Sequence, residues 1–402
     1  MRPALLATLA AAAAALGGAE ARADMWCATP LLLHEWGVHV FGPDGATATG
    51  ADALPAWFHT PSSRARVGPG GAVRGLPADN GVRKLPVVHL YAAEGERASI
   101  PVALEVGFAH GAASAWYPAV DTLRAAAVAN GPGAAAAKAQ LLIARDARLR
   151  GAAAGLLPSD PTRQLVWDRL DLERSPWAAP AQVDAGSWVD AARDLDEALW
   201  VNGRGESERF VFYEAATTER VPLAFFRGRN GLHLRNDGPH AVHDVFVVNR
   251  APRGLGDVVT VVFVADLAAG DAAPIDLGGP ALSPADAAAA TVGRLRGRLV
   301  NPLFPDARAI FEAPSAGPCA MGRDPALPTE QAAGFQLFAG EADLLLSVWE
   351  KRFFGASGVT VVYREDPAAL DAAMPLSVYT DMRHVPVVHR AGLAVWEHVR
   401  LP

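Results

Sequence analysis

The chain has few of the residues, and none of the short motifs, that most directly indicate an activity. Its only lysines are Lys84, Lys138 and Lys351, and its only cysteines are Cys27 and Cys319. The patterns GxSxG, HExxH, CxxC and the Walker-type phosphate loop are all missing from the sequence. There is therefore no serine nucleophile elbow, zincin helix, dithiol redox pair or nucleotide-phosphate loop on which to build a function.

A long membrane-spanning run is also lacking. The apolar run Ala4–Leu16 follows Arg2 and precedes the small-x-small sequence Ala21-Arg22-Ala23, which is the layout of a secretory signal. This run is too short and too rich in alanine for a stable membrane span. We therefore expect residues 1–23 to be a signal peptide cleaved after Ala23, and the mature protein to be periplasmic or secreted without a transmembrane anchor.

A strong charge of either sign is missing as well. The formal net charge is −7. Loss of Arg2, Arg22 and Glu20 with the signal would remove a net +1 and leave −8. A mildly acidic exported protein has no bulk attraction for nucleic acid or for an anionic membrane. The expected partner is an unknown ligand or another component of the cell envelope, and not nucleic acid.

The two cysteines can be read in two ways. In an oxidising compartment Cys27 and Cys319 can form a disulfide that ties the N-terminus to the C-terminal third of the chain. The alternative is two separate buried thiols, and the sequence leaves both open.

The stretch Leu31–Phe41, LLLHEWGVHVF, gathers the most chemistry in the fewest residues. Its valines and leucines favour a strand, and Gly37 disfavours a helix interior. Side chains alternate along a strand, so His34 and Trp36 should share one face, and Glu35 and His39 the other. The two histidines are five residues apart, whereas a zincin helix needs four, so this is not a zincin motif.

Candidate site residues follow from this stretch. We predict His34 and Glu35 as catalytic residues, and Trp36, His39 and the nearby His89 as ligand-binding residues; any metal or cofactor is unknown. His34 beside Trp36 suits an aromatic-walled pocket in which a neutral imidazole exchanges a proton. Glu35 and His39 would lie roughly 13 Å apart along the strand, so they cannot both ligate one ion. The competing interpretation is a half-buried strand whose Trp36 and one histidine simply pack inward.

The rest of the chain divides into four regions. We expect a β-rich region at 24–120, with a hairpin formed by Pro86–Tyr91 and Ile100–Phe108, and a mixed connecting region at 121–204. Strand-like runs recur about every ten residues in 205–278, which is typical of an antiparallel β-sandwich. A turn at 236–239 would pair the runs on either side of it, with Leu232 facing His243. Residues 279–402 should be helical over Pro284–Val300 and Thr329–Phe354, and then return to strands. The expected fold class is α+β, predominantly β, with a central antiparallel β-sandwich and a helical C-terminal part.

Three short motifs carry a resemblance to a known group. HEWG at His34–Gly37, FVFYE at Phe210–Glu214 and VWEKRFF at Val348–Phe354 are similar to those of a group of exported bacterial proteins with an N-terminal HEWG motif. The usual member has threonine where this chain has Val38. The resemblance implies export and a shared fold, and it implies no activity.

Two functions from different classes fit these observations. The favoured one is a periplasmic or secreted binding or structural protein of the cell envelope. The alternative is a metal-dependent enzyme, a hydrolase or an oxidoreductase, with its site built around the HEWGVH stretch.

Overall fold

The computed structural model describes residues 29–45, 54–60, 82–94, 99–109, 111–120, 123–125, 156–158, 164–195, 197–217, 219–253, 256–312, 337–381 and 383–402. These residues form a predominantly β structure with antiparallel sheets and few helices, which confirms the predicted dominance of β structure. The helical contribution of the C-terminal region is modest. Within this part of the chain, no helix combines the length and apolar character needed to cross a membrane.

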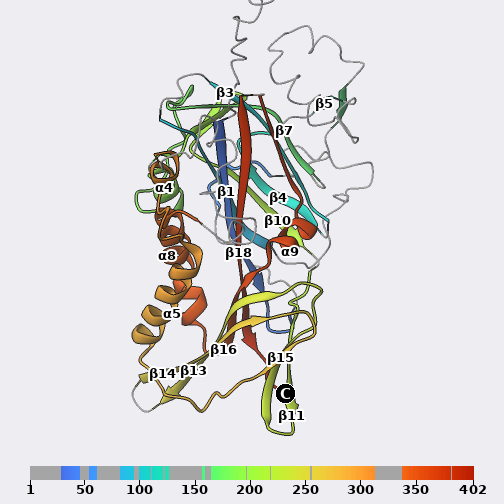
Figure 1. The fold of residues 1–402 in the computed structure, drawn as a ribbon, viewed down its shortest axis with the longest axis vertical. Helices are drawn as coiled ribbons and strands as arrows, with labels where there is room; N and C mark the ends of the chain where they lie inside the picture. The colour runs from blue at the N-terminus through green and yellow to red at the C-terminus, as the bar shows by residue number, and fades with distance from the viewer. Residues whose placement is uncertain are drawn as a thin grey trace, which may run out of the picture.

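An eight-stranded sheet is the centre of the fold, and β1 lies in its interior (Figure 1). In spatial order its strands are β14 (Gly256–Leu267), β13 (Val242–Arg253), β16 (Gly358–Glu365), β18 (His384–Val399), β1 (Thr29–Phe41), β2 (Val82–Tyr91), β10 (Val211–Thr217) and β4 (Gly111–Tyr117). β1 runs parallel to β18 and antiparallel to β2. The long HEWG strand is therefore covered on both edges, which suits its nearly continuous burial.

Smaller sheets complete the β structure. A five-stranded sheet has the order β17 (Leu376–Thr380), β3 (Ile100–Gly107), β7 (Gln164–Glu173), β8 (Trp200–Gly203) and β9 (Glu206–Glu208). A three-stranded sheet has the order β11 (Leu223–Gly228), β12 (Gly231–Asn236) and β15 (Ala272–Pro274), and β5 (Leu123–Ala125) pairs with β6 (Leu156–Pro158).

The described helices are α4 (Trp188–Arg193), α5 (Pro284–Leu299), α6 (Ala307–Phe311), α8 (Ala339–Gly355) and α9 (Pro367–Ala373). α5 begins where the sequence predicts. The side chain of Ser283 accepts a hydrogen bond from the amide of Asp286, and Pro284 occupies the first helical position, where no amide hydrogen is needed. α5 and α8 lie along one side of the molecule (Figure 1).

The alternating faces of β1 enter different cores. Trp36, Val38 and Val40 pack with α5 and α8. On the other face, Leu31 and Leu33 pack with the five-stranded sheet. Phe41, at the end of the strand, packs with the three-stranded sheet. The odd-numbered positions Glu35 to His39 lie between these two contacts. At this point along β1 the covering sheet changes from the five-stranded one to the three-stranded one.

The predicted hairpin of Pro86–Tyr91 and Ile100–Phe108 is wrong. β2 pairs with β1 and β10 in the eight-stranded sheet, whereas β3 pairs with β17 and β7 in the five-stranded sheet. Residues Val87–Tyr91 are all buried, as expected for a strand in the interior of a sheet covered on both faces.

The predicted pairing across the turn at 236–239 is also wrong. β12 pairs with β11 and β15, and β13 pairs with β14 and β16. The side chain of Asn236 explains the difference, because its amide nitrogen donates to the carbonyls of His240, Leu267 and Ala268. These bonds fix the chain as it leaves one sheet for the other instead of folding back on itself.

Several predictions fall on residues outside the described ranges. These are the signal peptide at residues 1–23, the disulfide between Cys27 and Cys319, and the start of the second predicted helix at Thr329. The four-region division also stays a prediction.

Candidate functional site

Three buried histidines form a row across neighbouring strands on the helix-facing side of the large sheet. His34 of β1 lies opposite His89 of β2 and opposite His389 of β18. Residues directly opposite one another project from the same face of a sheet, so the three imidazoles share one side. None of them exposes more than 2% of its surface. The ring centroids of His34 and His389 are 4.9 Å apart, with the planes tilted by 22°.

Glu341, in the first turn of α8, is the carboxylate that meets this row. Its Oε2 lies 2.7 Å from Nδ1 of His34 and accepts the backbone N–H of Phe338 at 2.9 Å. Its Oε1 accepts the hydroxyl of Tyr91 at 2.8 Å and lies 3.7 Å from Nδ1 of His89. The carboxylate is 1% exposed, so these contacts replace the water it loses on folding.

Charge in this cluster is set by burial and by these contacts. Burial alone would raise the pKa of Glu341, but the attraction of His34 and His89 and the hydrogen bonds from His34 and Phe338 hold that pKa below its usual range. Burial lowers the pKa of His89 from 6.5 to about 4, an effect that Glu341 and the carbonyl of Ala192 oppose only in part. At neutral pH the cluster therefore holds a carboxylate at Glu341 and a neutral imidazole at His89.

Trp36 shares the face of His34, as the alternation predicts. It is 1% exposed and its ring lies roughly parallel to that of His89, with the centroids 6.1 Å apart. Trp36 belongs to the core beneath α5 and α8. Its position is that of a packing residue.

Glu35 lies on the opposite face and is held in a buried ion pair. Its carboxylate accepts two hydrogen bonds from the guanidinium of Arg390, at 2.5 and 2.9 Å. Glu35 is 3% exposed and Arg390 5%, and Arg390 also donates to Asp371 at 2.6 Å. The sheet separates Glu35 from His34, so the structure does not bring the two predicted catalytic residues together. The bidentate pair joins β1 to β18.

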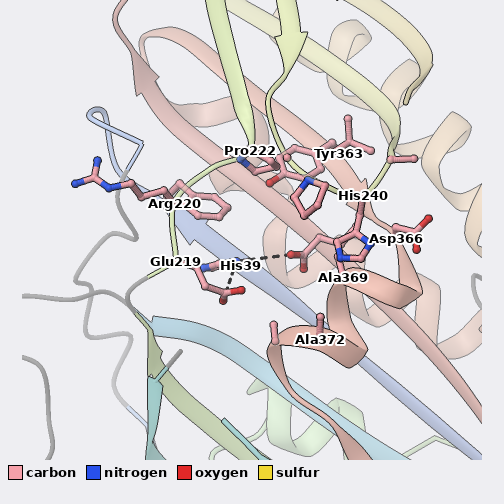
Figure 2. Close-up of a pocket in the computed structure, with 16 residues that line it drawn as sticks. His39, Glu219, Arg220, Pro222, His240, Tyr363, Asp366, Ala369 and Ala372 are labelled. Atoms are coloured by element: carbon pink, nitrogen blue, oxygen red, sulfur yellow. Dashed lines mark ion pairs between the residues drawn. The ribbon is translucent and has the colours of Figure 1, made fainter. Parts of the chain in front are cut away.

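His39 lies farther along β1, on the same face as Glu35, and it faces a pocket (Figure 2). Its Nδ1 is 3.7 Å from Oε1 of Glu365 and 4.0 Å from Oε2 of Glu219. His39 is 1% exposed, whereas Glu219 is exposed on 19% of its side chain. Two carboxylates thus flank one imidazole at the inner end of the pocket.

The pocket has a volume of about 200 Å³ and combines polar and apolar walls. Its polar lining residues are His39, Glu219, Arg220, His240, Glu365 and Asp366, and its apolar ones include Phe41, Pro222, Pro239, Val242, Tyr363, Ala369 and Ala372. The side chain of Arg220 extends away from the pocket, whereas His240 and Asp366 lie across it from His39 (Figure 2). Hydrogen-bonding groups next to an apolar wall are the usual construction of a small-molecule site.

A second, much smaller pocket lies over His34. It is lined by His34, His389, Asn301, Phe304, Ile310, Leu337 and Phe338, and has a volume of about 10 Å³, which is enough for about one water molecule. Nε2 of His34 makes no hydrogen bond with any part of the chain that the structure describes.

A repeated motif in the sequence marks two of the three histidines of the row. The sequence PVVH occurs twice, at Pro86–His89 and at Pro386–His389, and the two copies lie in the strands on either side of β1. The sequence contains no comparable motif at Glu341, Glu219 or Glu365. These carboxylates reach β1 only through the packing of α8 and of the segments that form the pocket.

Of the predicted site residues, the structure places His34 and His89 in one cluster, Trp36 beside them, Glu35 in a separate ion pair and His39 in the larger pocket. Among the described residues, no group of three or more His, Cys, Asp or Glu side chains is arranged to hold a metal ion. A scan against protein-family models gave no match, and a search of curated proteins gave none either.

Proposed function

We propose that this protein is exported and that it binds a small ligand in the pocket of His39, as a binding protein of the cell envelope or its surroundings. Export is supported by the N-terminal sequence, with Arg2, the apolar run Ala4–Leu16 and the small residues before Asp24. The similarity to the HEWG group of exported proteins supports the same location. In this proposal the packed sheets act as a sandwich-like scaffold that holds the pocket.

The observation that carries the binding proposal is the pocket itself. It joins hydrogen-bonding groups from three separate segments, represented by His39 of β1, Glu219 after β10 and Glu365 at the end of β16. The rings of Phe41 and Tyr363 and the small side chains of α9 supply the apolar wall. A ligand that fits this lining has hydrogen-bond donors at one end and an apolar body at the other.

The metal-dependent enzyme around HEWGVH has less support. His34 and Glu35 project from opposite faces of β1, and Glu35 is already paired with Arg390. The feature that favours acid–base chemistry is His39 between the carboxylates of Glu219 and Glu365, because such neighbours can orient an imidazole that exchanges a proton. Ligand binding requires no chemical group beyond those that line the pocket.

The binding proposal is tested by filling the pocket. Ala369 of α9 lines the pocket, whereas its neighbour Ala368 is exposed outside it. A panel of small amines, alcohols and amides with apolar bodies is screened against the purified protein by ligand-observed NMR. A hit should lose its signal with Ala369→Phe and keep it with Ala368→Phe. Hits that bind both variants equally, or a panel without hits, would contradict the proposal.

A further inference from the structure

The row of His89, His34 and His389 places three titratable rings in the interior. Glu341 is the carboxylate that contacts His34 and lies 3.7 Å from His89. The rings lie on three adjacent strands, and each exposes at most 2% of its surface. A protonated imidazole in such a place has lost its hydration and needs an acceptor close by. Whether His89 can take up a proton therefore depends on Glu341, its nearest carboxylate.

Glu341 has little capacity to accept a further hydrogen bond from His89. Its Oε2 already contacts Nδ1 of His34 and the amide of Phe338, and its Oε1 accepts from Tyr91. His89 stands 3.7 Å from Oε1, which is longer than a hydrogen bond. A proton on Nδ1 of His89 would therefore have no acceptor within hydrogen-bond distance among the described residues.

His89 has a defined tautomer at neutral pH. Its Nε2 lies 3.2 Å from the carbonyl oxygen of Ala192 in α4. A carbonyl only accepts hydrogen bonds, so Nε2 carries the proton and Nδ1 presents a lone pair toward Glu341. Acid would add a proton at Nδ1, next to His34 and in the field of Arg209, both of which oppose it. Glu341 is the one charged neighbour that favours the proton.

The part of the fold that can respond is the first turn of α8. It carries Glu341, and the preceding Phe338 covers His34, with the ring centroids 4.3 Å apart. The same segment borders the small pocket over His34, next to Asn301 and Phe304. The pairing of β1 with β2 and β18 does not involve this turn, so displacing it would uncover His34 while those strands stay paired.

We propose that the histidine row is an acid-sensitive latch: neutral His89 keeps the first turn of α8 closed over the sheet, and protonation of His89 releases that turn and admits water to His34. The latch is independent of the His39 pocket, which lies on the other face of β1. It would let an exported chain respond to the pH of its surroundings, since histidine is the side chain that titrates nearest to neutral pH.

Amide hydrogen exchange on the whole protein tests the latch. The reporters are the amides of Phe338, Ala339 and Ala342, which bond to Glu341, to the carbonyl of Pro305 and to the carbonyl of Phe338. After correction for intrinsic exchange, their protection should fall at least about tenfold between pH 7 and pH 5. At pH 5 the reporters should be at least about tenfold less protected than the amides of α5, because the turn opens while α5 stays folded. Equal protection of the reporters and of the α5 amides at pH 5 would mean that the turn opens only by global unfolding, and would overturn the proposal.

A substitution separates His89 from other titrating groups. His89→Gln keeps a side-chain donor for the carbonyl of Ala192 and removes the titration, so the reporters should stay protected at pH 5. His233→Gln is the control, because His233 lies on β12 away from the row. An unchanged loss of protection in His89→Gln would overturn the proposal. If His89→Gln does not fold, the wild-type comparison of α8 with α5 decides, together with an NMR titration that follows the His89 ring.

Discussion

His34 and His389 lie in register on neighbouring parallel strands, with their imidazole centroids 4.9 Å apart. The carboxylate partner of His34, Glu341, is 307 positions away along the chain. This relationship makes the HEWG strand the meeting point of the two ends of the chain. It also separates two kinds of polar environment on β1, a closed one at His34 and a pocket at His39.

Global stability should depend on pH through His89. Its folded-state pKa is lowered from 6.5 to about 4, so the unfolded chain binds the proton first as pH falls. This contribution to stability is complete above pH 6.5 and is lost as pH falls toward 4. Between pH 7 and pH 5 the free energy of unfolding should drop by about 2 kcal/mol from this group. Urea unfolding at both pH values measures the drop, and His89→Gln should lack that part of it.

The ion pair between Glu35 and Arg390 should be a structural requirement. Glu35→Leu leaves the buried guanidinium of Arg390 with Asp371, which is 66% exposed, as its remaining carboxylate contact in the described structure. We expect a loss of about 3–5 kcal/mol in the free energy of unfolding. The exposed pair of Arg296 and Asp343 is the control, and Asp343→Asn should cost less than about 1 kcal/mol. Equal effects of the two substitutions would argue against a structural role for Glu35.

Gly392 should tolerate no side chain, because it lies against the wall of the His39 pocket. A Cβ at this position would come within 2.7 Å of Oε2 of Glu365 and 2.8 Å of Cδ2 of Leu370. Gly392→Ala should therefore lower stability by about 1–3 kcal/mol and displace Glu365. Gly293 of α5 has open space around it, and Gly293→Ala should raise stability by about 0.5–1 kcal/mol. Thermal unfolding of both variants measures the contrast, and a neutral Gly392→Ala would refute the close approach.

Local patterns in the sequence predicted the elements well and the pairings poorly. The alternation of LLLHEWGVHVF correctly separates His34 from Glu35 and His39, and Ser283-Pro284 correctly marks the start of α5. These signals depend on neighbours along the chain. The contacts of Glu35 with Arg390 and of His34 with Glu341 join residues more than 300 positions apart. They are fixed by strand register and by the docking of α8, which a local pattern does not encode.

The hairpin error has the same origin. The largely apolar run Val87–Tyr91 is compatible with a strand at the centre of a sheet as well as with one arm of a hairpin. The outcome depends on which strands pair with its two edges, and β1 and β10 are supplied by distant parts of the chain. The repeated PVVH is present in the sequence, but the repeat by itself does not show that both copies flank β1.

The most direct test of the division along β1 is to compare His34→Ala with His39→Gln, using a compound from the panel that binds the wild-type protein. Each variant is measured for its free energy of unfolding and for its affinity by calorimetry. We expect His34→Ala to lose about 1–3 kcal/mol of stability and to keep its affinity, because His34 is a buried partner of Glu341. We expect His39→Gln to weaken binding at least about tenfold, or about 1.4 kcal/mol. Loss of binding in His34→Ala with unchanged stability, and normal binding in His39→Gln, would contradict the assignment of the ligand site to His39.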